Sequence, residues 1–125
     1  MKTGPFETAW GGIASLELGL SVMATLHNNL ADLAKWMSEA PAKLAGLSNK
    51  GKIAKGYDAD LVAFNPDVPW TVEPDKLYQR HKITPYAGHE LRGRVQATWL
   101  RGRKIYDDGK FSPVPQGRVL RRACK

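Results

Sequence analysis

The feature that most constrains the fold of this chain is an abrupt change of pattern after Gly46. Up to that glycine, residues 13–46 carry apolar side chains at helical spacing, and this predicts two to three helices. Beyond it, glycines and prolines divide the chain into short β-prone runs, which predicts three or four short strands. The chain is therefore expected to fold as helices first and strands second.

The helical part contains two apolar stripes. The first helix is expected over residues 13–26, with a stripe formed by Ile13, Leu16, Leu20 and Met23. Asn29 is an expected N-cap for a helix that begins at Leu30. The second stripe consists of Leu30, Leu33, Ala34 and Met37. Pro41 suits the first position of another short helix, which Gly46 can end.

The second part reads as short strands separated by turns. A short apolar strand is expected over residues 61–64, ended by Asn65-Pro66. A hairpin is expected between residues 95–100 and 104–106. The two expected turns are residues 101–103 and 107–110. Neither part looks complete, because the apolar stripes need a partner surface and a few short strands leave open sheet edges. The chain is therefore expected to be a piece of a larger fold.

Charge and cysteine content exclude several classes of protein. Nineteen basic and twelve acidic residues give a net charge of +7, but the basic residues alternate with apolar ones instead of forming a block. This favours a solvated basic face over a nucleic-acid interface. No apolar run is long enough for a transmembrane helix, so no membrane is expected. The single cysteine, Cys124, excludes a disulfide framework within the chain and favours a reducing, cytoplasmic location.

Residues that could carry hydrolytic chemistry are sparse. His27, His81 and His89 form no His-x-His pair, and no two of them are four residues apart. A zinc site requires three or four ligands, so neither a metal site nor a catalytic residue is expected in this chain. His27 is expected to be structural, at a helix end.

Asp58 and Asp60 are a carboxylate pair with a suggestive spacing. Two residues apart near a strand start, they would point to the same face, as a paired-carboxylate site requires. The alternative, which the sequence favours, is that Asp58 caps a turn beside Gly56 and Asp60 leads into the strand.

Two sets of residues resemble a known family. Residues 41–66 resemble a signature of the amidohydrolase superfamily. The matching residues are Pro41, Ala42, Gly46, Leu47, Gly51, Ile53, Gly56, Asp58, Ala59, Asp60, Leu61 and Val62. Residues 9–16, 78–86 and 92–103 resemble allantoinases, and residues 9–13 separate the chain from the related hydantoinases and dihydropyrimidinases.

The resemblance implies a fold class and a domain organisation. The class is α/β, comprising the C-terminal end of a (β/α)8 amidohydrolase barrel and the C-terminal strands of its flanking β-sandwich, incomplete alone. Residues 1–49 would hold the last loop and helices of the barrel. Residues 50–125 would hold the sandwich strands and the tail. His81 and Tyr86 would fix the junction of the two units or a subunit contact.

The resemblance also implies a function for the full-length protein. Allantoinases hydrolyse the cyclic amide of a small ureide, allantoin, to allantoate. Their two divalent metal ions, zinc or similar, have ligands that would all lie upstream of this chain. The chain is therefore expected to bind no metal and to be inactive without the missing N-terminal barrel portion, and the full-length family is expected to form homo-oligomers. A non-catalytic truncated remnant and a hydantoinase or dihydropyrimidinase fragment remain alternatives.

One loop of this chain would still lie near the substrate. By the resemblance, Trp10, Gly11 and Gly12 are expected to bind substrate, the two glycines through their backbone, because no Cβ blocks a close approach. The alternatives are that Gly11-Gly12 only makes a tight turn into the helix and that Trp10 packs in the core.

Overall fold

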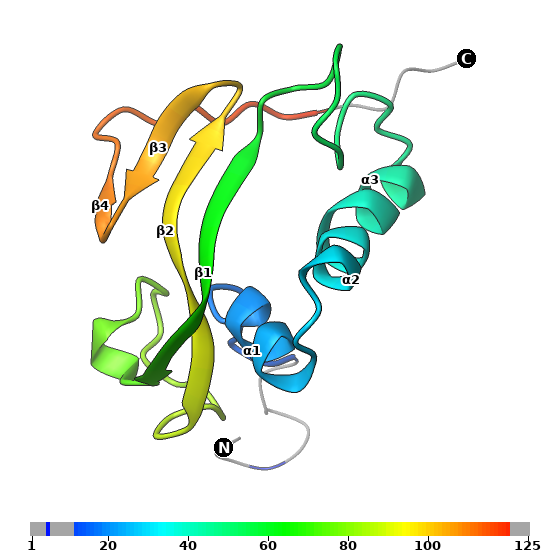
Figure 1. Ribbon diagram of the computed structural model, residues 1–125. Helices are drawn as coiled ribbons and strands as arrows, with labels where there is room; N and C mark the ends of the chain where they lie inside the picture. Colours follow the sequence, from blue (N-terminus) through cyan, green and yellow to red (C-terminus); the bar gives the residue numbers. More distant parts are fainter. Residues whose placement is uncertain (1–4, 6–11, 121–125) are drawn as a thin grey trace.

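Helices precede strands in the observed fold, as the sequence predicts (Figure 1). The computed structural model describes Pro5 and residues 12–120 of the chain. Within that part, three α-helices and a π-helical turn are followed by a four-stranded sheet. Figure 1 shows α1 beside the place where β1 and β2 cross, and α2 and α3 farther from the sheet.

The second helical segment is one nearly continuous run. It consists of α2 (Leu30–Ala34), the π-helical turn η2 (Lys35–Glu39) and α3 (Ala40–Ala45). Asn29 Oδ1 accepts hydrogen bonds from the backbone N–H groups of Ala31 and Asp32, at 3.0 and 3.2 Å, so the predicted N-cap is confirmed. Gly46 ends the run with φ 71°, as predicted. The π turn ends two residues before Pro41, whose ring would clash with a carbonyl four residues earlier in a regular α-helix.

Helix α1 (Gly19–Leu26) is shorter than predicted and presents a different face. The predicted stripe residue Leu16 lies before the helix and is exposed, whereas Leu18 is fully buried. Within α1 the buried residues are the small ones, Ser21 and Ala24. The prediction from apolar spacing was wrong here because close packing against the sheet selects small side chains for the inner face.

The sheet is an antiparallel meander. Its strands are β1 (Leu61–Thr71), β2 (Glu90–Leu100), β3 (Arg103–Asp107) and β4 (Lys110–Phe111), hydrogen-bonded in chain order. Both predicted turns are confirmed. The turn residues are Arg101 and Gly102, with φ 50° and 77°, and Asp108 and Gly109, with φ 39° and 86°. Two successive positive φ angles are typical of the type I′ turns that match the twist of a hairpin.

Strand β1 does not end at Asn65-Pro66, as the sequence predicted, but continues to Thr71. Its register against β2 shifts between Ala63 and Phe64 and again between Asn65 and Pro69. Proline cannot donate to a strand ladder, so it is tolerated at bulges and on edge strands. Among the described strands β1 is at the edge, and its irregular stretch contains Pro66 and Pro69. The prolines therefore deform the strand without ending it.

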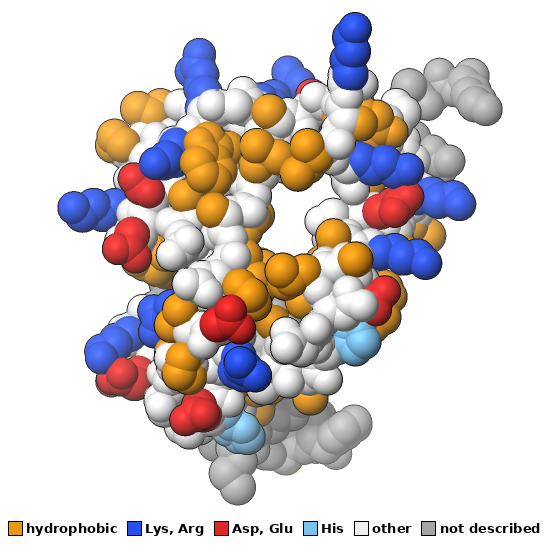
Figure 2. Space-filling view, in the orientation of Figure 1, with side chains coloured by type: hydrophobic (Ala, Val, Ile, Leu, Met, Phe, Trp, Pro, Cys, Tyr) orange, Lys and Arg blue, Asp and Glu red, His pale blue; other side chains and the backbone are white. Residues whose placement is uncertain are grey.

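The core lies at the α1 end of the sheet. Its buried residues are Leu18, Val72, Leu77 and Leu91, with Val22, Trp70 and Tyr86 packed around them. Elsewhere the structure is open: the space-filling view has an opening between the sheet and the α2–α3 segment, bordered in part by hydrophobic side chains (Figure 2). Of the described helices, α1 packs extensively on β2, whereas α2 and α3 make at most a few contacts with the sheet.

Helix α1 and strand β1 both contact β2 at Gly93. Ser21 Oγ donates a hydrogen bond to the Gly93 carbonyl at 2.8 Å, and Trp70 Nε1 donates to the same carbonyl at 3.0 Å. Gly93 has φ 89°, and a Cβ at this position would lie 2.1 Å from Cζ of the Phe64 ring. A side chain is excluded here both by backbone conformation and by space.

Candidate functional site

Gly12 is the one predicted substrate-binding residue that the structure describes. Trp10 and Gly11 are outside the described residues. Gly12 is exposed, with φ 91°, and a Cβ built on it would meet no atom within 4 Å. The positive φ accounts for glycine at this position, since other residues rarely adopt it. Substrate binding by residues 10–12 stays a prediction.

The histidines do not come together. His27 Nε2 lies 2.8 Å from Asp32 Oδ2, and its ring centroid is 4.8 Å from that of Trp36. His89 lies edge-on to Tyr86. His81 is exposed, on the loop between β1 and β2. Among the residues that the structure describes, no group of three or more His, Cys, Asp or Glu side chains could hold a metal ion. This part of the chain therefore does not fit the metal centre of the family.

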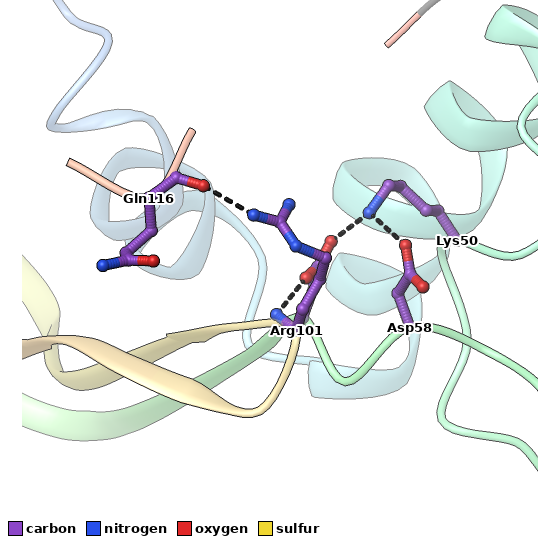
Figure 3. A network of polar contacts seen from close by, with 5 residues as sticks. Lys50, Asp58, Arg101 and Gln116 are labelled. Atoms are coloured by element: carbon purple, nitrogen blue, oxygen red, sulfur yellow. Dashed lines mark hydrogen bonds and ion pairs between the residues drawn. The ribbon is translucent and has the colours of Figure 1, made fainter. Parts of the chain in front are cut away.

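Asp58 and Asp60 do point to the same place, but a lysine occupies it (Figure 3). Lys50 Nζ donates to Asp58 Oδ2 at 2.8 Å and also to Asp60 Oδ2. Asp60 leads directly into β1, as expected, whereas the Asp58 side chain binds Lys50 and does not cap a turn. We call Lys50, Asp58 and Asp60 the Lys50 cluster. Both carboxylates are engaged by an ammonium group, which opposes a role for them as a proton-sharing catalytic pair.

The electrostatics of the Lys50 cluster favour its charged form. The hydrogen bonds to Asp58 and Asp60 raise the pKa of Lys50 above its ordinary value. Partial burial opposes ionisation of Asp60, but hydrogen bonds from Lys50 and from the Arg101 backbone N–H outweigh it and hold the pKa of Asp60 below its ordinary value. The Lys50 side chain is 14% exposed, so the pair is screened less than a fully solvated one.

The β2–β3 turn extends this network. The Arg101 backbone N–H donates to Asp60 Oδ1 at 2.8 Å, and the Arg101 guanidinium donates to the Gln116 carbonyl at 2.5 Å (Figure 3). The network thus joins the segment after α3, the start of β1, the β2–β3 turn and the C-terminal segment.

An open hollow of about 690 Å³ lies along the sheet and the loop that follows β1. Its walls include Trp70 with Arg94 stacked on it at 4.4 Å, and Tyr78 edge-on to Phe111 at 4.7 Å. The Glu17 carboxylate on its rim accepts the backbone N–H of Tyr78 at 2.8 Å. The hollow is therefore a packed aromatic surface whose rim carboxylate is already bonded, and it presents no converging set of catalytic groups among the described residues.

Two structurally important residues were not singled out from the sequence. Lys50 lies eight and ten residues before its partners, a separation with no local signature. Gly93 lies in a strand, where an isolated glycine can mark a close approach of another backbone or side chain. That signal was present and could have identified the close contact, which is with the Phe64 ring of β1. Tyr86 packs against the core, in keeping with a structural role.

Comparisons with known proteins agree with the resemblance seen in the sequence. Residues 9–105 match the amidohydrolase family. An allantoinase from Streptomyces avermitilis is 45% identical over 126 aligned residues, which are 98% of this chain and 28% of the relative. A probable allantoinase 2 from Dictyostelium discoideum is 44% identical over 85% of this chain and 22% of its own length.

A solved structure has the same fold over most of the chain. The D-hydantoinase (dihydropyrimidinase) from Thermus sp. superposes with a TM-score of 0.78 at 26% identity, over 86% of this chain and 25% of that protein. Every helix within residues 12–120 is too short or too polar to cross a membrane. The chain spans about a quarter of the length of the proteins it matches. The expected resemblance to allantoinases and the expected fold class are confirmed, and the chain belongs to the amidohydrolase family.

Proposed function

We propose that this chain is part of an allantoinase, which hydrolyses the cyclic amide of allantoin to give allantoate. The observation that carries the proposal is the 45% identity to an allantoinase over 98% of the chain. At that identity, the arrangement of helices and strands and most of the packing positions are retained, so the chain can take the same place in a whole enzyme.

The proposal divides the chain into two roles. Residues 1–49 would complete the barrel that carries the active site, and residues 50–125 would form strands of the flanking sandwich. Trp10, Gly11 and Gly12 would border the substrate. Support for a backbone contact at Gly12 comes from its exposure and from the open space around its Cα.

In this proposal the metal ions bind to the part of the whole enzyme that lies outside this chain. The family implies divalent ions, zinc or similar, yet the described residues of this chain offer no group that fits them. Their ligands would lie in the remainder of the whole enzyme. We also propose a homo-oligomeric, cytoplasmic enzyme; the single cysteine, Cys124, supports the reducing location.

A chimeric enzyme tests the proposal. The corresponding C-terminal segment of the Streptomyces avermitilis allantoinase is replaced by this chain, and allantoate formation is measured with zinc, cobalt or manganese. The expected result is turnover of allantoin within a factor of about ten, a loss of about 1.4 kcal/mol in transition-state stabilisation. The unfused chain serves as the control and should give no turnover. A folded, metal-loaded chimera that leaves allantoin intact would contradict the proposal.

A hydantoinase or dihydropyrimidinase is the second candidate, and the superposition on the Thermus sp. enzyme with a TM-score of 0.78 favours it. Its sequence identity of 26% is well below the 45% shared with the allantoinase. The same chimera distinguishes the two candidates when it is offered allantoin, hydantoin and dihydrouracil. A higher kcat/KM for hydantoin or dihydrouracil than for allantoin would reverse the assignment.

A further inference from the structure

The α2–α3 segment meets the sheet at the two ends of an opening. At one end, α1 packs on β2 and is connected to α2 through the short link at residues 27–29. At the other end lies the Lys50 cluster, which follows α3 (Figure 3). Between these ends α2 and α3 make at most a few contacts with the sheet, and the space-filling view shows the opening there (Figure 2). The angle of the segment to the sheet therefore depends on its two ends.

The helical side of the Lys50 cluster is the chain from α2 to Lys52. There, the backbone around Lys50 packs directly against η2 and α3. The Leu47 N–H donates to the Ala42 carbonyl at 2.9 Å, so the chain folds back onto α3 as it leaves the helix. A Cβ on Gly51 would lie 2.8 Å from both Ala42 Cβ and the Ser38 carbonyl oxygen. The backbone next to Lys50 is thus in direct contact with η2 and α3 and moves with them.

The sheet side of the cluster is the start of β1 and the β2–β3 turn. There, the Asp60 acceptor is held in place by hydrogen bonds to that turn. Asp60 immediately precedes β1, and its second carboxylate oxygen accepts the Arg101 N–H at 2.8 Å. The neighbouring Gly102 N–H donates to the Ala59 carbonyl at 2.9 Å. Residues 59–60 are therefore bound to the β2–β3 turn, and they move with the sheet.

We propose that Lys50 is a latch, holding the α2–α3 segment at one angle to the sheet by joining the helical side to Asp58 and Asp60. Without it, the hydrogen bond from the Asp58 N–H to the Asn49 carbonyl, 2.9 Å, is left to join the two sides there, so the segment pivots about the link to α1 and the opening changes width. Lys50 thereby positions the helical segment relative to the strands. The inference depends on this chain's geometry alone and holds whatever ring the enzyme opens.

A spin-label distance measurement tests the latch in the full chain. Cysteines replace Leu44 in α3 and Val62 in β1, two exposed positions, and Cys124→Ser removes the native thiol. Labelled chain is diluted with unlabelled chain so that distances between copies do not contribute. The expected result is a narrow distance distribution that at least doubles in width in Lys50→Met.

Lys52→Met is the matched control. Lys52 is two residues away and binds Glu39 at 3.0 Å, so its ion pair stays within the helical side and does not reach the sheet. The distribution should remain narrow in Lys52→Met and return to narrow in Lys50→Arg, which can still bridge both carboxylates. An unchanged distribution in Lys50→Met, or equal broadening in Lys52→Met, would overturn the proposal.

Acidification of the labelled chain with Lys50 intact provides a test that needs no variant at the latch. The charged groups facing Asp60 are Lys50 and Arg101, and Asp58 shares Lys50. Protonation of the two carboxylates should widen the distribution reversibly while near-ultraviolet circular dichroism shows the aromatic packing intact. A distribution that stays narrow until the aromatic signal is lost would also overturn the latch.

Discussion

At the scale of single residues, the Lys50 cluster should contribute more to stability than any exposed ion pair. Removing one partner of a buried pair costs about 3–5 kcal/mol, whereas exposed pairs contribute about 0–1 kcal/mol. Lys50 is 14% exposed and binds two carboxylates, so Lys50→Met is expected to lower the free energy of unfolding by about 1–3 kcal/mol. Lys52 is 52% exposed, and Lys52→Met should change it by less than about 1 kcal/mol. Urea unfolding of both variants is the measurement.

The stability difference between the unmodified chain and Lys50→Met should depend on pH. The lowered pKa of Asp60 gives stability that is present above the ordinary aspartate value, about 3.9, and is lost as pH falls through the lower folded value. The raised pKa of Lys50 gives stability that is present below the ordinary lysine value, about 10.4, and is lost as pH rises through the folded value. The difference between the unmodified chain and Lys50→Met should therefore be flat from about pH 5 to about pH 9 and shrink on either side. A difference that does not change in acid would mean that the carboxylates do not bind Lys50.

Gly93 is a second residue whose replacement has a clear outcome. Gly93→Ala forces a side chain into positive φ and against the Phe64 ring, 2.1 Å from its Cζ. Left-handed strain costs about 1–2 kcal/mol and overpacking about 1–3 kcal/mol, so the loss should be about 2–5 kcal/mol. Gly117→Ala is the control, because nothing lies within 4 Å of a Cβ there and its φ is not positive. Equal melting temperatures for the two variants would show that the close contact is not made in solution.

At the scale of elements, two polar contacts hold α1 against β2: one is made by Ser21, and in the other Thr25 Oγ1 accepts the Arg92 N–H at 2.8 Å. Ser21 is buried, and its hydroxyl donates to the Gly93 carbonyl at 2.8 Å. Ser21→Ala keeps the close packing but leaves one of two donors to that carbonyl, so a loss of about 0.5–1.5 kcal/mol is expected. Exposed Ser48 supplies the control as Ser48→Ala, with an expected change within about 0.5 kcal/mol. The measurement is the thermal melting temperature of each variant. Equal changes in Ser21→Ala and Ser48→Ala would mean that Ser21 does not anchor α1.

Elements defined by local chemistry were predictable from the sequence, whereas those set by distant packing were not. The Asn29 cap, the Gly46 terminus and both hairpin turns follow from residues that bind their own backbone or adopt positive φ. The start of α1 was wrong because Leu18 is buried among residues more than fifty positions away. The end of β1 was wrong because pairing with β2 outweighs the prolines.

The candidate site shows the same division. That Asp58 and Asp60 share a face follows from the alternation of a strand, and both do reach one point. That the point is occupied by Lys50 depends on the path of residues 46–58, which loops back from α3 to β1. No spacing rule describes such a loop, and so the ammonium group could not be placed in advance.

At the scale of the whole molecule, the chain encloses an opening bordered in part by hydrophobic side chains (Figure 2). The buried core found among the described residues lies beside α1, whereas three residues of the predicted second stripe are exposed: Leu30, Ala34 and Met37. Leu33 is the exception, at 3% exposed. The chain spans about a quarter of the length of the proteins it matches.

The exposed apolar surface leads to a prediction about the chain in isolation. Leu26, Leu44 and Ile53 are 77%, 88% and 90% exposed. A large aliphatic side chain left in water forgoes about 1.5–3 kcal/mol, so these three alone forgo about 5–9 kcal/mol. That is comparable with the whole net stability of a typical domain, about 5–15 kcal/mol.

We therefore expect the isolated chain to self-associate in a concentration-dependent way and to bind a hydrophobic dye. The net charge of +7 opposes association, and salt should strengthen it by screening that charge. Sedimentation velocity at several concentrations and salt levels is the measurement, with the chimeric enzyme as control, since its remaining sequence would cover these side chains. A monodisperse monomer with a sharp cooperative melt and no dye binding would show that these residues form a self-sufficient domain.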